Sequence, residues 1–291
     1  MMIPIFRSIL VTTDLTHRCD ARVASAAALA EATGARLHAV HVLHDGAPPT
    51  ETELERGRRR LARQLARVVP AGVRIASQRV VAEPPYRAIA EAAARCGAEL
   101  IVLGPAPAVS WANRLFGTTG DRVLRSLNIP VLVLREPLRL PLELVSVALR
   151  GAESGRGATA SALRWAGALG TRAELRVTRV MPPGTREPGR APIVPGRRPA
   201  AVTAAEEGVR VVEEARWADR PAEEIVRMAE RDRPGLLVME ADPRRPLSAS
   251  GWVHVARTSS VPVLVVPRAA PTATLRVPAL RVAARPVPVL G

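Results

Sequence analysis

The sequence predicts an α/β protein made of two tandem domains, each an open, doubly wound, mostly parallel sheet. Short apolar, β-branched runs alternate with helical segments, and the same succession of landmarks occurs twice along the chain. The length of 291 residues agrees with two domains of about 150 residues each. A hydrophobic fraction of 47% is sufficient for buried cores and excludes a chain that is disordered throughout.

The duplication is carried by four apolar runs that recur in the same order. They lie at 8–11, 36–42, 99–103 and 128–134 in the first half, and at 144–147, 174–180, 235–239 and 261–266 in the second. Each run has the length of a strand, and helical stretches separate most of them. Alternation at this spacing indicates βαβ units and therefore a Rossmann-like sheet in each half.

Proline-rich stretches mark the borders of the two domains. Residues 135–141 interrupt the pattern with two prolines, so we place a first domain at 1–137 and a second at 138–268. The stretch from Met181 to Pro199, rich in Pro, Gly and Arg, is predicted to be a loop within the second domain. Residues 269–291 lack periodicity and are expected to form an extended or disordered tail, with docking as a peptide as the alternative.

Three helices of the first half have recognisable ends. Asp20 is expected to cap the first helix, which ends at Gly34. Thr50 and Glu53 have the spacing of a capping box at the start of the second. A third is predicted to start at Pro84-Pro85 and to end at Gly97.

Composition argues against several classes of partner. The formal net charge is +15, but all 42 basic residues are arginines scattered along the chain and aromatic residues make up only 2%, so we do not expect a nucleic-acid-binding protein. No apolar run approaches the roughly 18 residues of a membrane span. Two cysteines, Cys19 and Cys96, cannot form a disulfide framework, so we expect a reducing, cytoplasmic setting without a signal peptide.

The candidate site lies where parallel strands end, because ligands of open α/β sheets bind beyond the carboxyl ends of the strands. Asp14 follows the first strand, Val42 ends the second and Gly104 follows the fourth. Further on, the turn 117–120 (Gly-Thr-Thr-Gly) precedes a helix that starts near Asp121. Such a turn offers backbone N–H groups and hydroxyls to a phosphate, although its threonines could simply cap the helix.

These residues resemble the universal stress protein family over nearly the whole chain. The similarity consists of Asp14 after the first strand, Gly104 and Pro107, a spacing of nine residues, Gly117-Thr118, and the closing strand 130–133. Nucleotide-binding members of that family carry Gly, two residues, Gly, nine residues, and Gly with Ser or Thr. The spacing is kept here, while proline replaces the second glycine.

The resemblance implies an adenine nucleotide, ATP or AMP, in the first repeat, with the early aspartate at adenine and the late Gly-Thr turn at the phosphates. The cofactor-binding residues implied are Thr12, Thr13, Asp14, Val42, Leu103, Gly104, Pro107, Gly117, Thr118, Thr119 and Gly120. Pro107 has a fixed φ and no N–H donor, so it should weaken binding about tenfold or more if that donor is used by the ligand. The need for Mg²⁺ is left open.

The second repeat departs further from the pattern. No acidic residue occurs in 144–152, and Glu240 replaces the glycine after the fourth strand, where phosphate would lie. We therefore expect a structural role for this repeat. The resemblance also implies that the last strands of the two repeats, 131–134 and 261–266, pair within one chain as a pseudo-dimer, and it leaves a further homodimer open.

Two functions from different classes follow. The first is a stress-response regulatory protein that binds an adenine nucleotide in its first repeat; the alternative is a nucleotide-free protein-interaction scaffold in which both sites have decayed. Slow ATP hydrolysis is a third reading, although no catalytic residue is visible beyond Asp14. The histidines His38, His41 and His44 alternate in direction along a strand, so no metal site is predicted.

Overall fold

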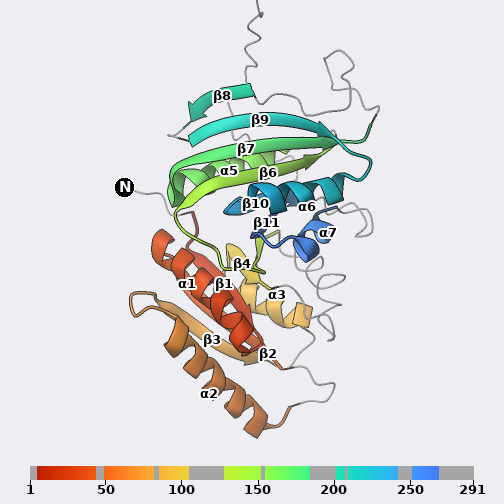
Figure 1. The fold of residues 1–291 in the computed structure, drawn as a ribbon. Coiled ribbons are helices and arrows are strands. Elements are labelled where there is room, and N and C mark those ends of the chain that lie inside the picture. The colour runs from red at the N-terminus through yellow and green to blue at the C-terminus, as the bar shows by residue number, and fades with distance from the viewer. Residues whose placement is uncertain are drawn as a thin grey trace, which may run out of the picture.

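The described residues form one continuous sheet of 11 strands with helices on both faces (Figure 1). This architecture is seen in a computed structural model that describes residues 5–43, 49–81, 85–104, 128–151, 155–183, 201–206, 209–241 and 251–268. The strand order is β3-β2-β1-β4-β5-β11-β10-β6-β7-β9-β8. Apart from β8, the order in one half mirrors that in the other, which confirms the predicted α/β class and the duplication.

The first repeat contains five parallel strands. Its elements are β1 (Ser8–Thr13), the 3-10 helix η1 (His17–Cys19), α1 (Asp20–Thr33), β2 (Arg36–Val42), α2 (Glu51–Val68), β3 (Ile75–Val81), α3 (Pro85–Cys96), β4 (Leu100–Leu103) and β5 (Val131–Val133). β1 lies between β2 and β4, and β5 follows β4.

The second repeat has the same core order with one replacement. Its elements are β6 (Leu142–Arg150), α5 (Arg156–Leu169), β7 (Gly170–Met181), β8 (Ala201–Glu206), β9 (Val209–Trp217), α6 (Pro221–Asp232), β10 (Leu236–Ala241), α7 (Gly251–Thr258) and β11 (Val263–Pro267). Where the first repeat inserts α2, the second has β8, an added strand antiparallel to β9. The start of the loop predicted at 181–199 was placed one residue too early, because Met181 is the last residue of β7.

The two repeats meet at an antiparallel pair formed by β5 and β11. Leu132 lies opposite Leu264, and Val131 and Val133 lie opposite Val265 and Val263. All six side chains are buried. The predicted pairing of the last strands is thus confirmed, and two edges that would expose apolar strands are removed from solvent.

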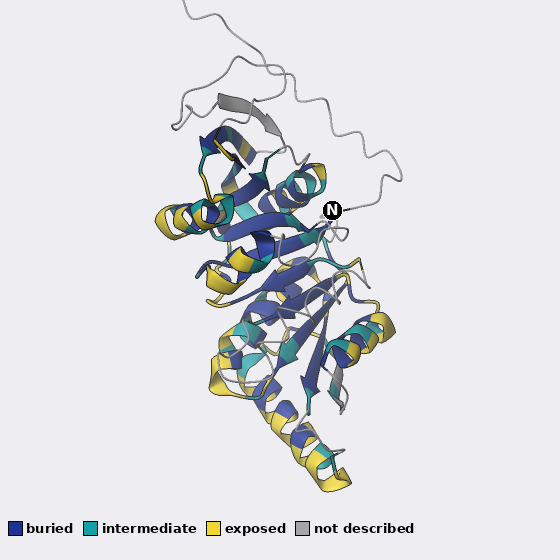
Figure 2. Ribbon diagram, turned by 90° about the vertical axis from the view of Figure 1, so that its right-hand side faces the viewer, coloured by how far each residue is buried: buried dark blue, intermediate teal, exposed yellow. Residues whose placement is uncertain are grey.

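Two hydrophobic cores cover opposite faces of the sheet, and each runs through both repeats. One core packs β1, β2, β6 and β7 against α1, α2 and α5. The other packs the opposite face against α3, α6 and α7. Figure 2 shows the strands almost wholly buried, whereas the helices are exposed along their outer faces. The alternation of side chains along β5 and β11 sends Leu132 and Leu264 into one core and their valine neighbours into the other.

Helix ends agree with the sequence except at the start of α1. α3 begins at Pro85, and Gly97, with φ +57°, follows its last residue, as predicted. The capping box of Thr50 and Glu53 is present, and Gly34 ends α1 with φ +68°, where glycine avoids the strain of a Cβ. Asp20, however, does not cap α1: it is the first helical residue, and its carboxylate binds Gln64 and Arg67 of α2 instead. That prediction was wrong because a long-range contact occupies the aspartate.

A network of charged side chains lies between β7, β9 and α6 in the second repeat. Arg176 bridges Glu174 and Asp232 at 2.7 and 3.1 Å. Glu214, only 1% exposed, accepts hydrogen bonds from Thr178 and Arg216. Partial burial would raise the pKa of Asp232, but the charges and hydrogen bond of the neighbouring arginines outweigh it and lower that pKa. The network is thus internally neutralised.

None of the helices in the described part of the chain is long and apolar enough to cross a bilayer. The predicted tail, 269–291, lies outside the described residues, as do residues 184–200 of the predicted loop.

The seam between β5 and β11 should contribute strongly to stability. We expect Leu264→Ala to lower the free energy of unfolding by about 2–5 kcal/mol, because Leu264 is fully buried and the cavity cannot collapse within a sheet. Denaturant unfolding measures this, with Leu163→Ala, a half-buried leucine of α5, as the control. A loss no larger than that of the control would contradict the packing described for the seam.

Asp232 should make stability depend on acid pH. Its pKa is lowered in the folded chain, so its contribution is fully present above about pH 4, where the unfolded carboxyl titrates, and is lost as pH falls through the lower folded pKa. Asp232→Asn should therefore destabilise the protein at pH 7 and reduce its further loss of stability in acid. Urea unfolding at pH 7 and at an acid pH below about 4 tests this, with the exposed Asp219→Asn as control. Equal loss of stability in acid by wild type and Asp232→Asn would contradict it.

Candidate functional site

The carboxyl ends of β1, β2 and β4 meet at one edge of the first repeat. Thr13 at the end of β1 is in register with His41, and Val11 with Val102. The strand ends therefore bring the residues predicted from the three segments to the same edge: Thr12, Thr13, Asp14, Val42, Leu103 and Gly104. The remaining predicted residues, Pro107, Gly117, Thr118, Thr119 and Gly120, lie outside the described residues.

Asp14 is exposed in the loop after β1, and one of its carboxylate oxygens is firmly held. Oδ1 accepts hydrogen bonds from Thr16 N at 2.8 Å, Thr16 Oγ1 at 2.6 Å and Cys19 Sγ at 2.8 Å. Desolvation opposes ionisation, but these bonds and the charge of Arg22 lower the pKa of Asp14 below its ordinary value. The group is thus a carboxylate at neutral pH, and Oδ2 accepts no hydrogen bond from any described residue.

Cys19 supports Asp14 and is not activated as a nucleophile. The thiol is buried, and this desolvation raises its pKa above the ordinary value. It remains protonated and donates to Asp14 Oδ1.

The side chain of Thr13 points into the protein. Its hydroxyl donates to Gln64 Oε1 at 2.8 Å and accepts from Leu15 N at 3.0 Å. Gln64 of α2 also donates to Asp20 and to the Thr16 carbonyl oxygen. The loop that carries Asp14 is therefore attached to α2, and Thr13 contributes to the shape of this loop through buried contacts. Thr12 Oγ1 lies 3.5 Å from the Val102 carbonyl oxygen, toward β4.

Arg22 is a feature of this edge that the sequence analysis missed. From the first turns of α1 its guanidinium donates to the Thr12 carbonyl oxygen at 3.3 Å and lies directly against Gly104, where any side chain would collide with it. Its Nε is buried and has no acceptor among the described residues. The signal was available: α1 starts at the same edge as Asp14, so a basic residue in its first turn faces the strand ends.

The equivalent edge of the second repeat has different charges. Through the register with β10, Arg150 occupies the position of Asp14, and Glu240 occupies that of Gly104. The Glu240 side chain is 4% exposed, and its Oε1 accepts from Arg268 Nε at 2.7 Å. An arginine and a glutamate–arginine pair thus occupy this edge.

The histidines of β2 take structural positions. His38 and His41 are both buried, on opposite faces of the strand, and His41 Nδ1 lies 2.9 Å from the Thr13 carbonyl oxygen. His44 lies outside the described residues. Within the described ranges no cluster of three or more His, Cys, Asp or Glu side chains could hold a metal ion.

Comparisons with known proteins agree with the duplicated architecture. The model of the universal stress protein family matches residues 5–135 and again residues 152–267. No curated protein sequence matches the chain.

Two solved structures that match over most of their length and of this chain have the same fold, and a third matches one half of the chain. A universal stress protein from Archaeoglobus fulgidus is 17% identical, with 90% of this chain and 96% of that chain covered and a TM-score of 0.67. A protein from Pseudomonas aeruginosa, described as a putative universal stress protein, is 19% identical over 91% of this chain and 94% of its own, with a TM-score of 0.56. A universal stress protein in complex with cAMP is 22% identical over 45% of this chain and 98% of its own, with a TM-score of 0.37.

Because the family model matches both halves in turn, the chain belongs to the universal stress protein family as a member with two repeats.

Proposed function

We propose that the protein is a stress-response regulatory protein that binds an adenine nucleotide, ATP or AMP, at the edge formed by Asp14, Val42 and Gly104 of its first repeat. The second repeat is structural in this proposal. The observation that carries it is the pair of opposite charges at the strand ends, Asp14 and Arg22, beside a glycine.

Arg22 provides a cation suited to a nucleotide phosphate or ribose oxygen. Guanidinium groups bind such oxygens through directed hydrogen bonds, and a buried N–H without an acceptor costs about 1–3 kcal/mol. The Nε of Arg22 is such a donor among the described residues. A ligand oxygen that reached it would relieve this cost, so this group favours an anionic ligand at Gly104.

Asp14 provides a complementary acceptor. The hydrogen bonds to Oδ1 fix the orientation of the carboxylate, and Oδ2 remains to accept from a ligand N–H such as the exocyclic amine of adenine. An ionised acceptor strengthens that bond. Val42, half-buried at the end of β2, supplies apolar surface at the same edge.

The structural role of the second repeat is supported by its own side chains. Glu240 places a negative charge at the position of Gly104, and its bond to Arg268 satisfies that charge internally. Its other oxygen, Oε2, approaches Gly157 in the first turn of α5, where the helix dipole favours an anion. A nucleotide phosphate would have to displace this carboxylate.

The proposed setting is the cytoplasm, consistent with two cysteines that are both free thiols. The seam between β5 and β11 makes the pseudo-dimer within one chain, and β3 and β8 form the ends of the joined sheet. A further homodimer would therefore form through surfaces other than the last strands.

Calorimetric titration of nucleotide-free protein with ATP tests the proposal. We expect one equivalent to bind, Arg22→Gln to weaken binding about tenfold or more through loss of a charged hydrogen bond, and Asp14→Ala to weaken it similarly. Arg18→Gln, an exposed arginine of η1, is the matched control and should leave affinity unchanged.

Absence of heat with folded protein at millimolar ATP would overturn the nucleotide proposal and favour the interaction scaffold. Two equivalents bound would instead contradict the structural role of the second repeat.

A further inference from the structure

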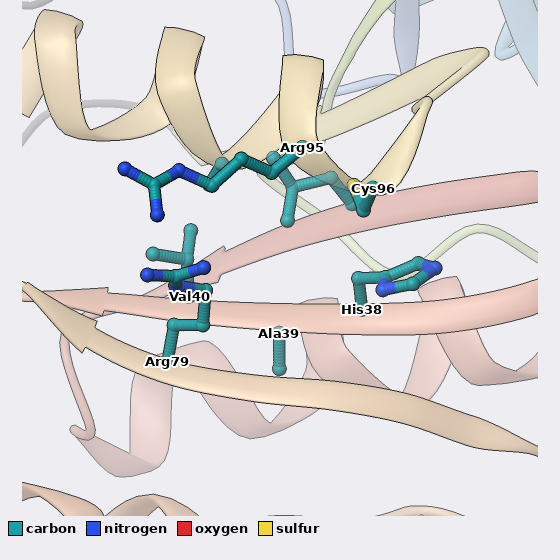
Figure 3. Close-up of a pocket in the computed structure, with 8 residues that line it drawn as sticks. His38, Ala39, Val40, Arg79, Arg95 and Cys96 are labelled. Carbon is teal, nitrogen blue, oxygen red and sulfur yellow. The ribbon is translucent and has the colours of Figure 1, made fainter.

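A cavity separate from the nucleotide edge lies on the α3 side of the sheet. It has a volume of about 190 Å³ and is bounded by β1, β2, β3 and α3. The side chains that matter here are His38, Val40, Arg79, Ala92, Arg95 and Cys96 (Figure 3). It opens beside the edge strand β3, in the middle of the strands rather than at their carboxyl ends.

The cavity is positively charged at one end. Arg79 and Arg95 both line the cavity with Val40, and Figure 3 shows their guanidinium groups on the same side of the view, away from His38 and Cys96. Arg95 is exposed, and its guanidinium lies 3.2 Å from the Glu91 carboxylate. An ion pair on the surface contributes little to stability, so this guanidinium can exchange Glu91 for another carboxylate at small cost. Arg79 is half-buried and forms no ion pair with a described residue.

The opposite end of the cavity is uncharged. His38 and Cys96 lie there beside each other (Figure 3). Burial, with the charge of Arg36, lowers the pKa of His38, and burial raises the pKa of Cys96. At neutral pH the imidazole and thiol are thus uncharged, and together with Leu10 and Ala92 they make a surface without formal charge.

The second repeat has different side chains at the positions equivalent to those that line the cavity. Arg79 pairs with Val40 in the register of β2 and β3, and Glu214 takes the same place opposite Thr178 in β7 and β9. The helices α3 and α6 have equal length and equal spacing to the next strand, so Asp232 corresponds to Cys96 and Met228 to Ala92.

In that repeat the carboxylates satisfy the cations, and a longer side chain fills the space. Asp232 binds Arg176 at 3.1 Å, and Glu214 binds Arg216 at 3.2 Å. Met228 is 7% exposed and packs in the core. The first repeat has Arg79 at the position of Glu214 and lacks the carboxylate of Asp232 and the methionine side chain. Its cavity therefore has two arginines, no acidic side chain in its lining, and less apolar filling.

We propose that this cavity binds a small organic carboxylate with a compact apolar body. The carboxylate supplies the negative charge that the lining of this cavity lacks and pairs with Arg79 and Arg95, where a guanidinium can bind both oxygens. The apolar body packs against Val40, Ala92 and the neutral His38 and Cys96. A cavity of about 150 Å³ accepts benzene, so 190 Å³ suits a ligand of similar size.

Benzoate is the probe, and binding to the full chain is followed by calorimetry and by amide chemical shifts. We expect saturable binding in the millimolar range or tighter, stronger than binding of acetate, which lacks the ring, and of benzamide, which lacks the charge. Arg79→Gln should weaken benzoate about tenfold or more, because it removes a charged hydrogen bond.

Ala92→Met introduces the side chain that Met228 has at the equivalent position of the second repeat. It should abolish benzoate binding by filling the cavity. Arg63→Gln, on the exposed face of α2, is the control and should bind like wild type. Circular dichroism checks folding, and Arg79 lies at the sheet edge, so Arg79→Gln keeps the test informative if Ala92→Met does not fold. Absent binding, binding no stronger than that of acetate, or binding unchanged in Arg79→Gln would overturn the proposal.

Discussion

The antiparallel pair of β5 and β11 is the constraint on which the arrangement of the molecule depends. Each repeat alone would end in a short, apolar strand with unpaired N–H and C=O groups, and such an edge favours aggregation. Pairing these strands satisfies both edges at once and buries Leu132 against Leu264. Because every other pair except β8·β9 is parallel, this one antiparallel pair sets the direction of all strands in one repeat relative to the other.

Two consequences follow for function. Because β5 and β11 are antiparallel, the carboxyl ends of the strands in the two repeats point in opposite directions. The edge with Asp14 and Gly104 and the edge with Arg150 and Glu240 therefore do not face each other. At the same time, equivalent helices lie on the same face of the sheet, which gives two cores that continue through the seam. The repeats can therefore diverge in their sites while they share one framework.

That divergence has a common physical form. At the strand ends, Glu240 and Arg268 form an ion pair where the first repeat has Gly104 and the guanidinium of Arg22. On the helix side, Glu214 and Asp232 neutralise arginines where the first repeat has Arg79 and Cys96. In both places the second repeat has carboxylates paired with its own arginines, and the first repeat has an arginine without such a carboxylate at the equivalent position. A comparison of the repeats thus indicates where the first one has room and charge for an anionic ligand.

The sequence predicts most of the architecture and part of the edge. Periodicity and repetition are local signals, so they identify four recurring strands in each repeat, the duplication and the capping box at Thr50, but they did not locate β3 or β9. Asp20 was misassigned, and Arg22 and the cavity at Arg79 were missed, because each depends on contacts between segments distant in the chain. The added strand β8 also escaped prediction, because it has no counterpart in the first repeat and pairs only with β9.

Amide hydrogen exchange at the seam is the most direct test of this account. If β5 and β11 join the repeats into one cooperative sheet, the amides of Leu132 and Leu264 should exchange as slowly as those of the central strands β1 and β6, through global unfolding. Exchange as fast as that of the end strand β3, with the centres of the two repeats still protected, would show that the repeats open independently and would contradict the account.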